Sequence, residues 1–564
     1  MIKDLAPRKC LFTFLGFCGS AVLLTVSQVP FELDFLAWVA LVPFILVCSP
    51  DARPWRLVWV SYLVSLIYWL GNLYWIAIVT VPAYILFCMY LGLYWPLLAL
   101  CVRYCRKKVP GGLFIMVPLI VVGAEAWQGY LITGFNWRLL AHSQYANLSL
   151  IQIADIFGAT GVSFIIAMVN GLVAALVIDA WQRKVFRIPN ILKTAFVFLV
   201  LLGTLIYGGW RISQTEESTR PGPVVGSVQP NVPSNIKELS EAGDAILADV
   251  IKRSNACIEA GAKLVAWPET IVLTTLNKDY LELCSPDTRP RMFDKEISEH
   301  AKERAYILLG AHAAIIGVKD SEYVVTDRFN SAYLYRPDGV QDPKRYDKIH
   351  LVPFGEYIPF RESIPFIADL VVKLSPYDYD YHLTHGRNYT IFEMADGQAD
   401  YGFGVLICYE DTDPVVTRKM VVGTGGAKRA DWLVNISNDG WYVRFKDGEV
   451  LPSVELGQRA AISVFRAVEN RISILRSVNT GISCIIDSVG RIKDGFLAGD
   501  LPAGAMERQG VGGWFVDRIG VDKRVTFFSR GRRWLDFSCA TVWPVVIILT
   551  LSSVIKGRKS RGLK

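Results

Sequence analysis

Runs of apolar residues, each about as long as a bilayer is thick, limit how this chain can fold more than any other feature of its sequence. Seven runs lie in the first 210 residues and an eighth follows much later, near 11–29, 34–50, 57–80, 82–103, 113–133, 150–178, 190–210 and 537–555. A helix needs about 20 such residues to cross the hydrocarbon core. The pattern predicts a polytopic α-helical membrane domain of eight transmembrane helices.

Basic residues are distributed unevenly among the connecting loops. Lys3, Arg8 and Lys9 precede the first run, and further clusters lie at 103–108 and 556–564. Because Lys and Arg favour the cytoplasmic side, we expect a cytoplasmic N-terminus and an extracytoplasmic interval after the seventh run. We interpret the first run as a retained helix, with a cleaved signal peptide as the alternative, since no convincing cleavage site follows it.

The long interval between the seventh and eighth runs is polar and carries its own folding pattern. Short β-branched runs, such as 223–228 and 403–407, alternate with stretches of helical periodicity, such as 244–259 and 458–471. Strands mixed with helices over about 300 residues predict one large α/β sandwich domain.

The sequence thus predicts four segments. They are a transmembrane domain of seven helices at 1–210, an extracytoplasmic domain at 221–521, a C-terminal transmembrane helix at 537–555 and a basic cytoplasmic tail at 556–564. The net charge of +7 has its clearest concentrations beside the apolar runs. We therefore interpret it as a determinant of topology and expect no nucleic-acid partner.

Three apolar runs of the polar interval are followed by a reactive side chain. Glu269 comes just after the run 264–267, where a carboxylate under apolar cover can act as general base and then as acid. Lys348 can place an ammonium against a developing oxyanion. Cys408 ends the run 403–407, and a thiol at a strand-to-helix turn beside a base and a cation is a candidate nucleophile.

Each of these three residues also has a structural interpretation when taken alone: a surface Glu in a turn, a solvated Lys, and a buried, inert Cys. His350 suggests a Cys–His dyad as an alternative, although a histidine beside an apolar run is more often structural. The other cysteines of the interval, Cys257, Cys284 and Cys484, keep the inert interpretation. None of the eleven cysteines shows zinc-type spacing and we find no nucleotide-binding glycine loop, so we expect neither metal nor cofactor.

Glu269, Lys348 and Cys408 occur in the order of the Glu-Lys-Cys triad of the nitrilase superfamily, which the sequence resembles. With its apolar runs it resembles, more narrowly, the bacterial apolipoprotein N-acyltransferase family. The motifs of this narrower resemblance extend along nearly the whole chain: GFNW at 134–137, VQPNVP at 228–233, FGEYIP at 354–359, CYE at 408–410, NISNDGW at 435–441 and RSVNTG at 476–481.

The resemblance implies a nitrilase-like α-β-β-α sandwich for the extracytoplasmic domain. The Glu, Lys and Cys would then be catalytic, with Glu356, Tyr409 and Glu410 as supporting active-site residues. It also implies a multi-pass protein of the cell inner membrane, with the catalytic domain on the periplasmic side.

The family's reaction implies two steps and two partners. The cysteine takes an acyl chain from a membrane phospholipid as a thioester, and the α-amino group of the diacylglyceryl-cysteine of an apolipoprotein then accepts it. Glu269 would move the protons, while Lys348 and backbone N–H groups hold the oxyanion.

The chain departs from the family pattern at two places. Glu238 stands where the family often has a tryptophan, and residues 442–444 replace a common Phe-Gly. A lipid-contacting role at Glu238 is therefore an open question. Aromatic and apolar segments at 441–442 and 364–374 are candidates for mobile lids, with ordinary core packing as the alternative.

Two other functions fit parts of the sequence. A membrane-tethered nitrilase-type amidase acting on a small amide would use the same triad, although eight spans are more than a tether needs. A transporter or receptor would not need the cysteine. Ionisable residues inside membrane spans are typical of transporters, but the apolar runs contain mainly Glu125 and Asp155, which are too few for a convincing transport path.

Overall fold

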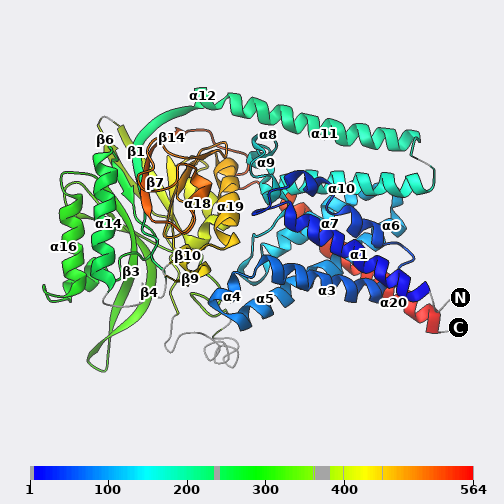
Figure 1. Cartoon of the computed structure of the whole chain (residues 1–564), viewed down its shortest axis with the longest axis horizontal. Coiled ribbons are helices and arrows are strands. Elements are labelled where there is room, and N and C mark those ends of the chain that lie inside the picture. The colour runs from blue at the N-terminus through cyan, green and yellow to red at the C-terminus, as the bar shows by residue number, and fades with distance from the viewer. Residues whose placement is uncertain are drawn as a thin grey trace. The chain divides into compact units, whose positions relative to one another are not determined.

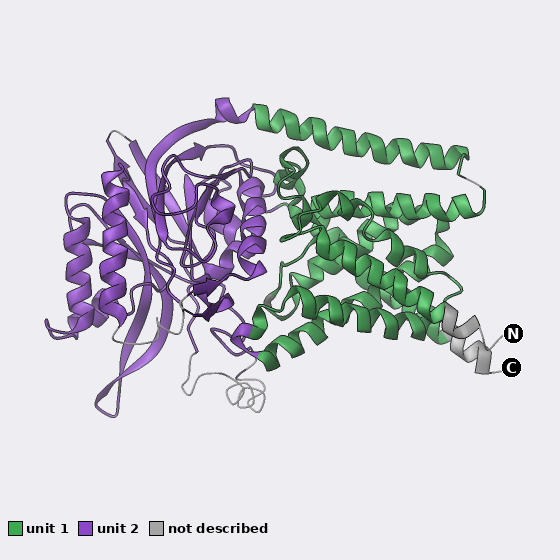
Figure 2. Ribbon diagram, in the orientation of Figure 1, with its two compact units in different colours: residues 1–77, 81–213, 532–564 green, residues 78–80, 214–531 purple. Residues whose placement is uncertain are grey.

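The computed structural model describes residues 5–183, 185–233, 242–359, 361, 382–397, 399–447 and 449–562. The chain forms two compact units (Figure 2). Unit 1 comprises Met1–Ala77, Val81–Ser213 and Arg532–Lys564, and unit 2 comprises Ile78–Thr80 and Gln214–Gly531.

Unit 1 is helical. Its longer helices are α1 (Leu5–Val26), α3 (Pro54–Asn72), α5 (Val81–Gly92), α6 (Tyr94–Lys108), α7 (Leu113–Gln128), α10 (Ala159–Trp181), α11 (Ile188–Ser213) and α20 (Trp534–Gly562). Helix α7 packs against α10 and α20. A Cβ added to Gly123 of α7 would lie 2.6 Å from the backbone oxygen of Cys539, so only glycine allows α20 to approach this closely.

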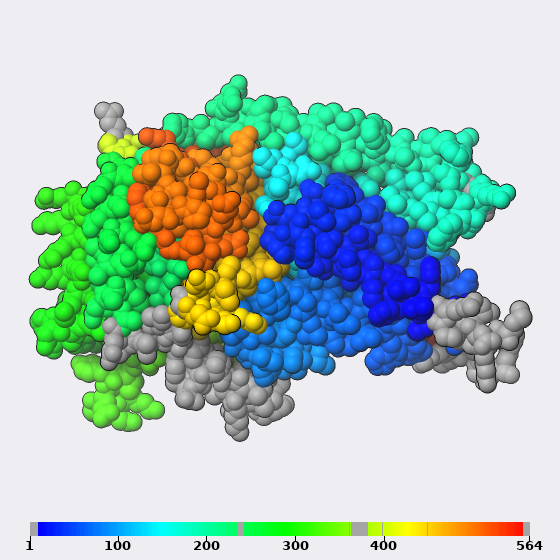
Figure 3. All heavy atoms as spheres, in the orientation of Figure 1, coloured from blue at the N-terminus to red at the C-terminus, as the bar shows by residue number. Residues whose placement is uncertain are grey.

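Six helical segments in the described part of the chain are long and apolar enough to cross a membrane. They are Lys9–Val26, Val81–Lys108, Pro110–Gln128, Ala159–Trp181, Ile188–Ser213 and Trp534–Ile555. Exposed apolar side chains cover helices such as α1 and α11, which lie at the surface of unit 1 (Figure 3). Such side chains are typical of a surface that faces lipid.

The two remaining apolar runs fold differently from single long spans. Run 34–50 forms two short helices, η1 (Asp34–Trp38) and α2 (Val42–Val47), and run 57–80 forms α3 and the short α4 (Ile76–Val79). The predicted number of eight transmembrane helices therefore stays a prediction. Run 150–178 is also divided, because Gly158 has a φ of 75° and ends α9 (Ala154–Phe157) before α10 begins.

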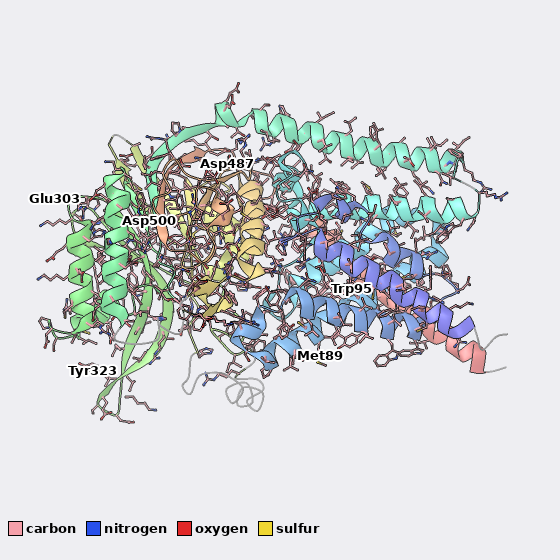
Figure 4. The ribbon with its side chains drawn as sticks, in the orientation of Figure 1. Met89, Trp95, Glu303, Tyr323, Asp487 and Asp500 are labelled. Atoms are coloured by element: carbon pink, nitrogen blue, oxygen red, sulfur yellow. The ribbon has the colours of Figure 1, made fainter. Side chains whose placement is uncertain are left out.

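Two acidic side chains inside unit 1 are bonded to protein groups. A Glu125 oxygen accepts a hydrogen bond from the backbone N–H of Leu140 at 2.8 Å. Asp155 pairs with Arg211 at 2.8 Å and accepts a hydrogen bond from Tyr207 at 2.7 Å. Aromatic packing adds to this core at Trp95, labelled in Figure 4, whose ring lies 5.5 Å from that of Phe44. These contacts give both ionisable residues a structural role.

Unit 2 contains two six-stranded sheets. The first has the order β14 (Gly513–Asp522), β1 (Thr219–Gln229), β2 (Leu264–Ala266), β3 (Tyr306–Lys319), β4 (Glu322–Tyr335) and β5 (Gln341–Asp347). The second has the order β13 (Ile492–Lys493), β12 (Cys484–Ile486), β11 (Ser473–Val478), β8 (Trp432–Ser437), β7 (Ala399–Ile407) and β6 (Ile391–Asp396). The Ser477 hydroxyl on β11 donates to the Ala266 carbonyl on β2 at 2.8 Å, so the sheets face each other.

Helices cover the outer face of each sheet (Figure 1). Helix α14 (Ala242–Glu259) and α16 (Arg289–Ala301) pack on the first sheet, and α18 (Pro414–Val421) and α19 (Val454–Asn470) pack on the second. The shorter elements are α12 (Thr215–Ser218), α15 (Lys278–Glu282), β9 (Arg444–Lys446) and β10 (Glu449–Leu451). The layers form the α-β-β-α sandwich that the resemblance to the nitrilase superfamily implies.

The strand directions explain where a site can form. Strand β2 runs parallel to β1 and β3, and β7 and β11 both run parallel to β8. The carboxyl ends of parallel strands meet at one edge of a sheet, where side chains from separate loops converge. Glu269 follows β2 and Cys408 follows β7, so the two facing sheets bring both residues to such an edge.

Candidate active site

Glu269 is buried, with only 5% of its surface exposed, and is held by three donors. Its Oε1 accepts a hydrogen bond from Asn330 Nδ2 at 2.7 Å and lies 3.4 Å from Lys348 Nζ. Its Oε2 accepts a hydrogen bond from the backbone N–H of Asn438 at 2.8 Å. The carboxylate is thereby fixed in one orientation before any substrate binds.

The backbone beneath Glu269 needs a glycine. A Cβ on Gly310 of β3 would lie 2.7 Å from the Cα of Glu269 and 2.5 Å from the nitrogen of Thr270. Neither backbone atom can move without displacing the carboxylate. Gly310 therefore allows the segment after β2 to lie directly on β3.

Lys348 follows β5 and is 1% exposed. Its ammonium lies 2.8 Å from the carboxylate of Glu356 as well as 3.4 Å from Glu269. Burial lowers the pKa of Lys348, but the nearby charges of Glu356, Cys408 and Glu269 outweigh burial and raise the pKa above its ordinary value. Lys348 is therefore a permanent cation at neutral pH.

Cys408 lies on a sharp turn between β7 and the 3-10 helix η5 (Cys408–Thr412). Its φ of 51° is in the left-handed region, which costs a residue with a Cβ about 1 kcal/mol or more. Burial, and then the charge of Glu269, raise the pKa of the thiol to about 12 against the opposite effects of Arg459 and Lys348. The resting thiol is protonated, so nucleophilic attack requires a base that takes its proton.

Glu410 joins the segment after Lys348 to the strand before Cys408. Its Oε1 accepts hydrogen bonds from the backbone N–H groups of Ile349 at 2.7 Å and His350 at 3.0 Å. Its Oε2 accepts one from the N–H of Ile407 at 2.8 Å. The side chain is fully buried and acts by positioning these two segments.

Glu356 has the same kind of multiple contact, whereas Tyr409 lies at the side of the cluster. Besides Lys348, Glu356 accepts hydrogen bonds from Asn330 Nδ2 at 3.1 Å and from the Val352 N–H at 2.8 Å. The Tyr409 ring packs edge-on against His350, with centroids 5.5 Å apart.

Comparisons with known proteins identify the family of the chain. Residues 20–172 match the family model of the apolipoprotein N-acyltransferase N-terminal domain, and residues 224–496 match that of carbon-nitrogen hydrolase. A protein from Geobacter metallireducens named apolipoprotein N-acyltransferase is 32% identical over 510 residues, which cover 87% of each chain. The chain belongs to the apolipoprotein N-acyltransferase family.

Two further matches have lower sequence identity. A Bdellovibrio bacteriovorus protein with the same name is 25% identical, over 95% of this chain and 92% of that protein. Among solved structures, an amidase from Nesterenkonia sp. is 16% identical, with a TM-score of 0.34 over 56% of this chain and 94% of the amidase.

In this member of the apolipoprotein N-acyltransferase family, the His350 ring is bonded to Asp413, outside the cluster of Glu269, Lys348 and Cys408. Its Nδ1 lies 2.5 Å from Asp413, whose other oxygen caps α18 by accepting the Val415 N–H at 2.6 Å. Burial lowers the pKa of His350, but Asp413 outweighs it and raises the pKa above its ordinary value. The contact favours the structural interpretation of this histidine.

The predicted lids and the departure at Glu238 lie largely outside the described residues. Glu238 and the segment 364–374 fall there entirely. Trp441 and Tyr442 are described and end the short helix η6 (Asp439–Tyr442), where both are half-buried. Their role as a lid stays a prediction.

Three residues that the sequence did not indicate belong to this site. Asn330 bridges Glu269 and Glu356, and the backbone of Asn438 holds Glu269. The positive charge of Arg459 opposes burial, which raises the pKa of the Cys408 thiol. The NISNDGW motif contains Asn438, but no local pattern marks Asn330 or Arg459 in this apolipoprotein N-acyltransferase relative. Within the described residues, no group of three or more His, Cys, Asp or Glu side chains is placed to hold a metal ion.

Proposed function

We propose that this protein is an apolipoprotein N-acyltransferase that uses Cys408 as its nucleophile, Glu269 as its base and Lys348 as the cation that stabilises charge. One observation carries the proposal. A cysteine on a left-handed turn shares a buried cluster with a fixed carboxylate and a permanent ammonium. Membership of the family supplies the substrates, a phospholipid donor and a diacylated apolipoprotein acceptor.

In the first step, Glu269 takes the thiol proton of Cys408 and the sulfur attacks the carbonyl carbon of a phospholipid ester. The negative charge that develops on the carbonyl oxygen is stabilised by Lys348 and by backbone N–H groups. When the ester C–O bond breaks, Glu269 returns the proton to the leaving alkoxide. The products are a lysophospholipid and an acyl thioester on Cys408.

In the second step, the α-amino group of the apolipoprotein's lipidated cysteine attacks the thioester. Glu269 accepts a proton from the attacking amine, and the same donors hold the second oxyanion. The C–S bond breaks, the amide forms, and the proton returns to the sulfur of Cys408. Glu356 keeps Lys348 in place, and Glu410 and Tyr409 support the turn that carries the nucleophile.

The membrane topology belongs to the same proposal. We place seven helices in 1–210, the catalytic domain at 221–521, an eighth helix at 537–555 and a basic cytoplasmic tail at 556–564. The distribution of basic residues supports a cytoplasmic N-terminus, a periplasmic catalytic domain and a location in the inner membrane.

An amidase acting on a small soluble amide remains the second candidate, because it would use the same three residues. The match of residues 20–172 to the apolipoprotein N-acyltransferase N-terminal domain favours the lipid substrate. In the acyltransferase the final acceptor is an amine, whereas in the amidase it is water.

Mass spectrometry of protein extracted from phospholipid membranes tests the proposal. We expect an acyl-sized mass on the peptide that contains Cys408, and we expect Cys408→Ala to lack it. Cys484→Ser is the matched control, because Cys484 is also buried in the second sheet but lies within a strand. An unmodified Cys408 after incubation with phospholipid, in protein that hydrolyses a small amide, would support the amidase instead.

A further inference from the structure

The cluster around Lys348 has more negative than positive groups. Its one ammonium is in contact with two carboxylates, at 2.8 Å from Glu356 and 3.4 Å from Glu269. When the Cys408 thiolate forms, its proton moves to Glu269, so the sulfur and Glu356 are then the two negative groups beside one ammonium. Lys348 alone does not balance these two charges, and uncompensated charge is costly in a buried site.

Arg459 supplies positive charge from the second layer of helices. It lies on α19, which packs against η5, the 3-10 helix that begins at Cys408. Its Nε lies 3.2 Å from Asp411, and its Nη1 lies 3.0 Å from Asp439 and 3.3 Å from Glu455. These contacts fix the guanidinium plane next to the nucleophile's turn.

One end of this guanidinium is unused. Arg459 is 1% exposed, yet its Nη2 has no hydrogen-bond partner within the described structure. Arginine carries five N–H donors, and a buried donor without a partner is destabilising. The vacant donor points to a group that occupies the position during function.

The contact with Asp411 places Arg459 beside the turn that carries Cys408, since Asp411 and Cys408 belong to the same 3-10 helix, and we assign the position at Nη2 to Cys408. The electrostatics agree: burial lowers the pKa of Arg459, whereas the charge of Asp411 and then of a Cys408 thiolate raise it, each more than Asp439 or Glu455 does. Burial and then the charge of Asp439 raise the pKa of Glu455 well above its ordinary value, which favours its protonated form. Asp411 is shared with Arg476, whose Nη1 lies 2.6 Å from it, so Arg459 does not have this carboxylate to itself.

We propose that Arg459 is a second catalytic cation, whose Nη2 donates to the Cys408 sulfur and to the acyl oxygen that develops charge beside it. The inference rests on the proposed function and adds a residue to its mechanism. No proton leaves the guanidinium in this role. The groups that face the thiol are then Glu269, Glu356, Lys348, Arg459 and Tyr442.

Alkylation of Cys408 by iodoacetamide measures the effect without any acyl substrate. Full-length protein in detergent is treated between pH 7 and 10, and modification is quantified on the Cys408 peptide. Exposed Cys10 in the same sample serves as the internal reference. We expect Arg459→Gln to lower the Cys408 rate about tenfold or more, because each unit of thiol pKa changes the thiolate fraction tenfold. Arg459→Lys, which keeps the charge, should stay within about threefold of wild type by the same relation.

Arg466 on the same helix provides the matched control. It is equally buried and donates to the Thr412 carbonyl at 3.0 Å, at the far end of η5 from Cys408. Arg466→Gln should leave the Cys408 profile unchanged. If Arg459→Gln does not fold, the double variant Arg459→Gln/Asp439→Asn removes a cation together with its carboxylate and should show the same tenfold loss.

Two results would overturn the inference: an Arg459→Gln rate within about threefold of wild type, or an equal loss in Arg466→Gln. In acyl transfer, Arg459→Gln should lower kcat with little change in KM. If wild-type Cys408 takes no acyl chain, the proposed function fails, and the alkylation profiles still decide the role of Arg459.

Discussion

The ammonium of Lys348 lies 2.8 Å from the carboxylate of Glu356, closer than the 3.4 Å that separates it from Glu269. Glu356 thus holds the lysine in position and leaves Glu269 less tightly paired. A base that is not locked in a short ion pair can accept a proton more readily. The two carboxylates therefore have different proposed roles: Glu356 positions Lys348, and Glu269 is available as the base.

Replacing Glu356 with Gln should slow acylation of Cys408 about 10- to 100-fold while the protein stays folded, because Lys348 loses the group that fixes its position. The measurement is the rate at which label from a radiolabelled phospholipid appears on the protein. Glu393→Gln is the matched control, since Glu393 forms an exposed pair with Lys344 at the same 2.8 Å. Equal rates for the two variants would contradict a positioning role.

The left-handed turn at Cys408 predicts an unusual order of stabilities. Cys408→Gly should unfold at a higher temperature than Cys408→Ala, because glycine adopts a φ of 51° with less strain, worth about 1 kcal/mol. Both variants should be unable to form the acyl enzyme. Thermal unfolding in detergent measures the difference, and a more stable Ala variant would show that the turn is not strained.

The contact between His350 and Asp413 predicts a pH-dependent contribution to stability. The folded-state pKa of His350 is raised, so its stabilising effect is complete below the unfolded-state pKa and is lost as pH rises through the folded-state value. His350→Gln should therefore lower the unfolding temperature more at pH 5.5 than at pH 8.5. A catalytic histidine would instead abolish acylation when replaced, which a labelling assay on the same variant would reveal.

Glu410→Gln should destabilise unit 2 by about 2–4 kcal/mol, although the side chains have the same shape. Both carboxylate oxygens accept hydrogen bonds from backbone N–H groups, so an amide nitrogen at either position meets a donor. The loss should appear as a lower unfolding temperature together with slower acylation. Unchanged unfolding would mean that the backbone groups find water instead.

Local patterns were sufficient for much of the fold. Helical periodicity at 244–259 and 458–471 predicted α14 and α19, and the apolar run before Cys408 predicted the end of β7. Strands β4, β5 and β14 are among those that were not predicted. Strand β4 begins with two exposed residues, the charged Glu322 and the aromatic Tyr323, the latter labelled near the hairpin tip in Figure 4. Without a continuous apolar pattern, their pairing with β3 could not be inferred.

The sequence by itself determined the apolar helices and indicated the three candidate catalytic residues, because each depends on hydropathy or on a motif that lies within a few residues. Only the tertiary structure decided which groups surround them. Asn330 is 61 positions from Glu269 along the chain, and Asn438 is 169 positions from it. Contacts of that separation depend on the register and facing of two sheets, which no local periodicity specifies. The effect of the Arg459 charge on the Cys408 thiol also depends on tertiary structure, because it results from the packing of α19 against η5.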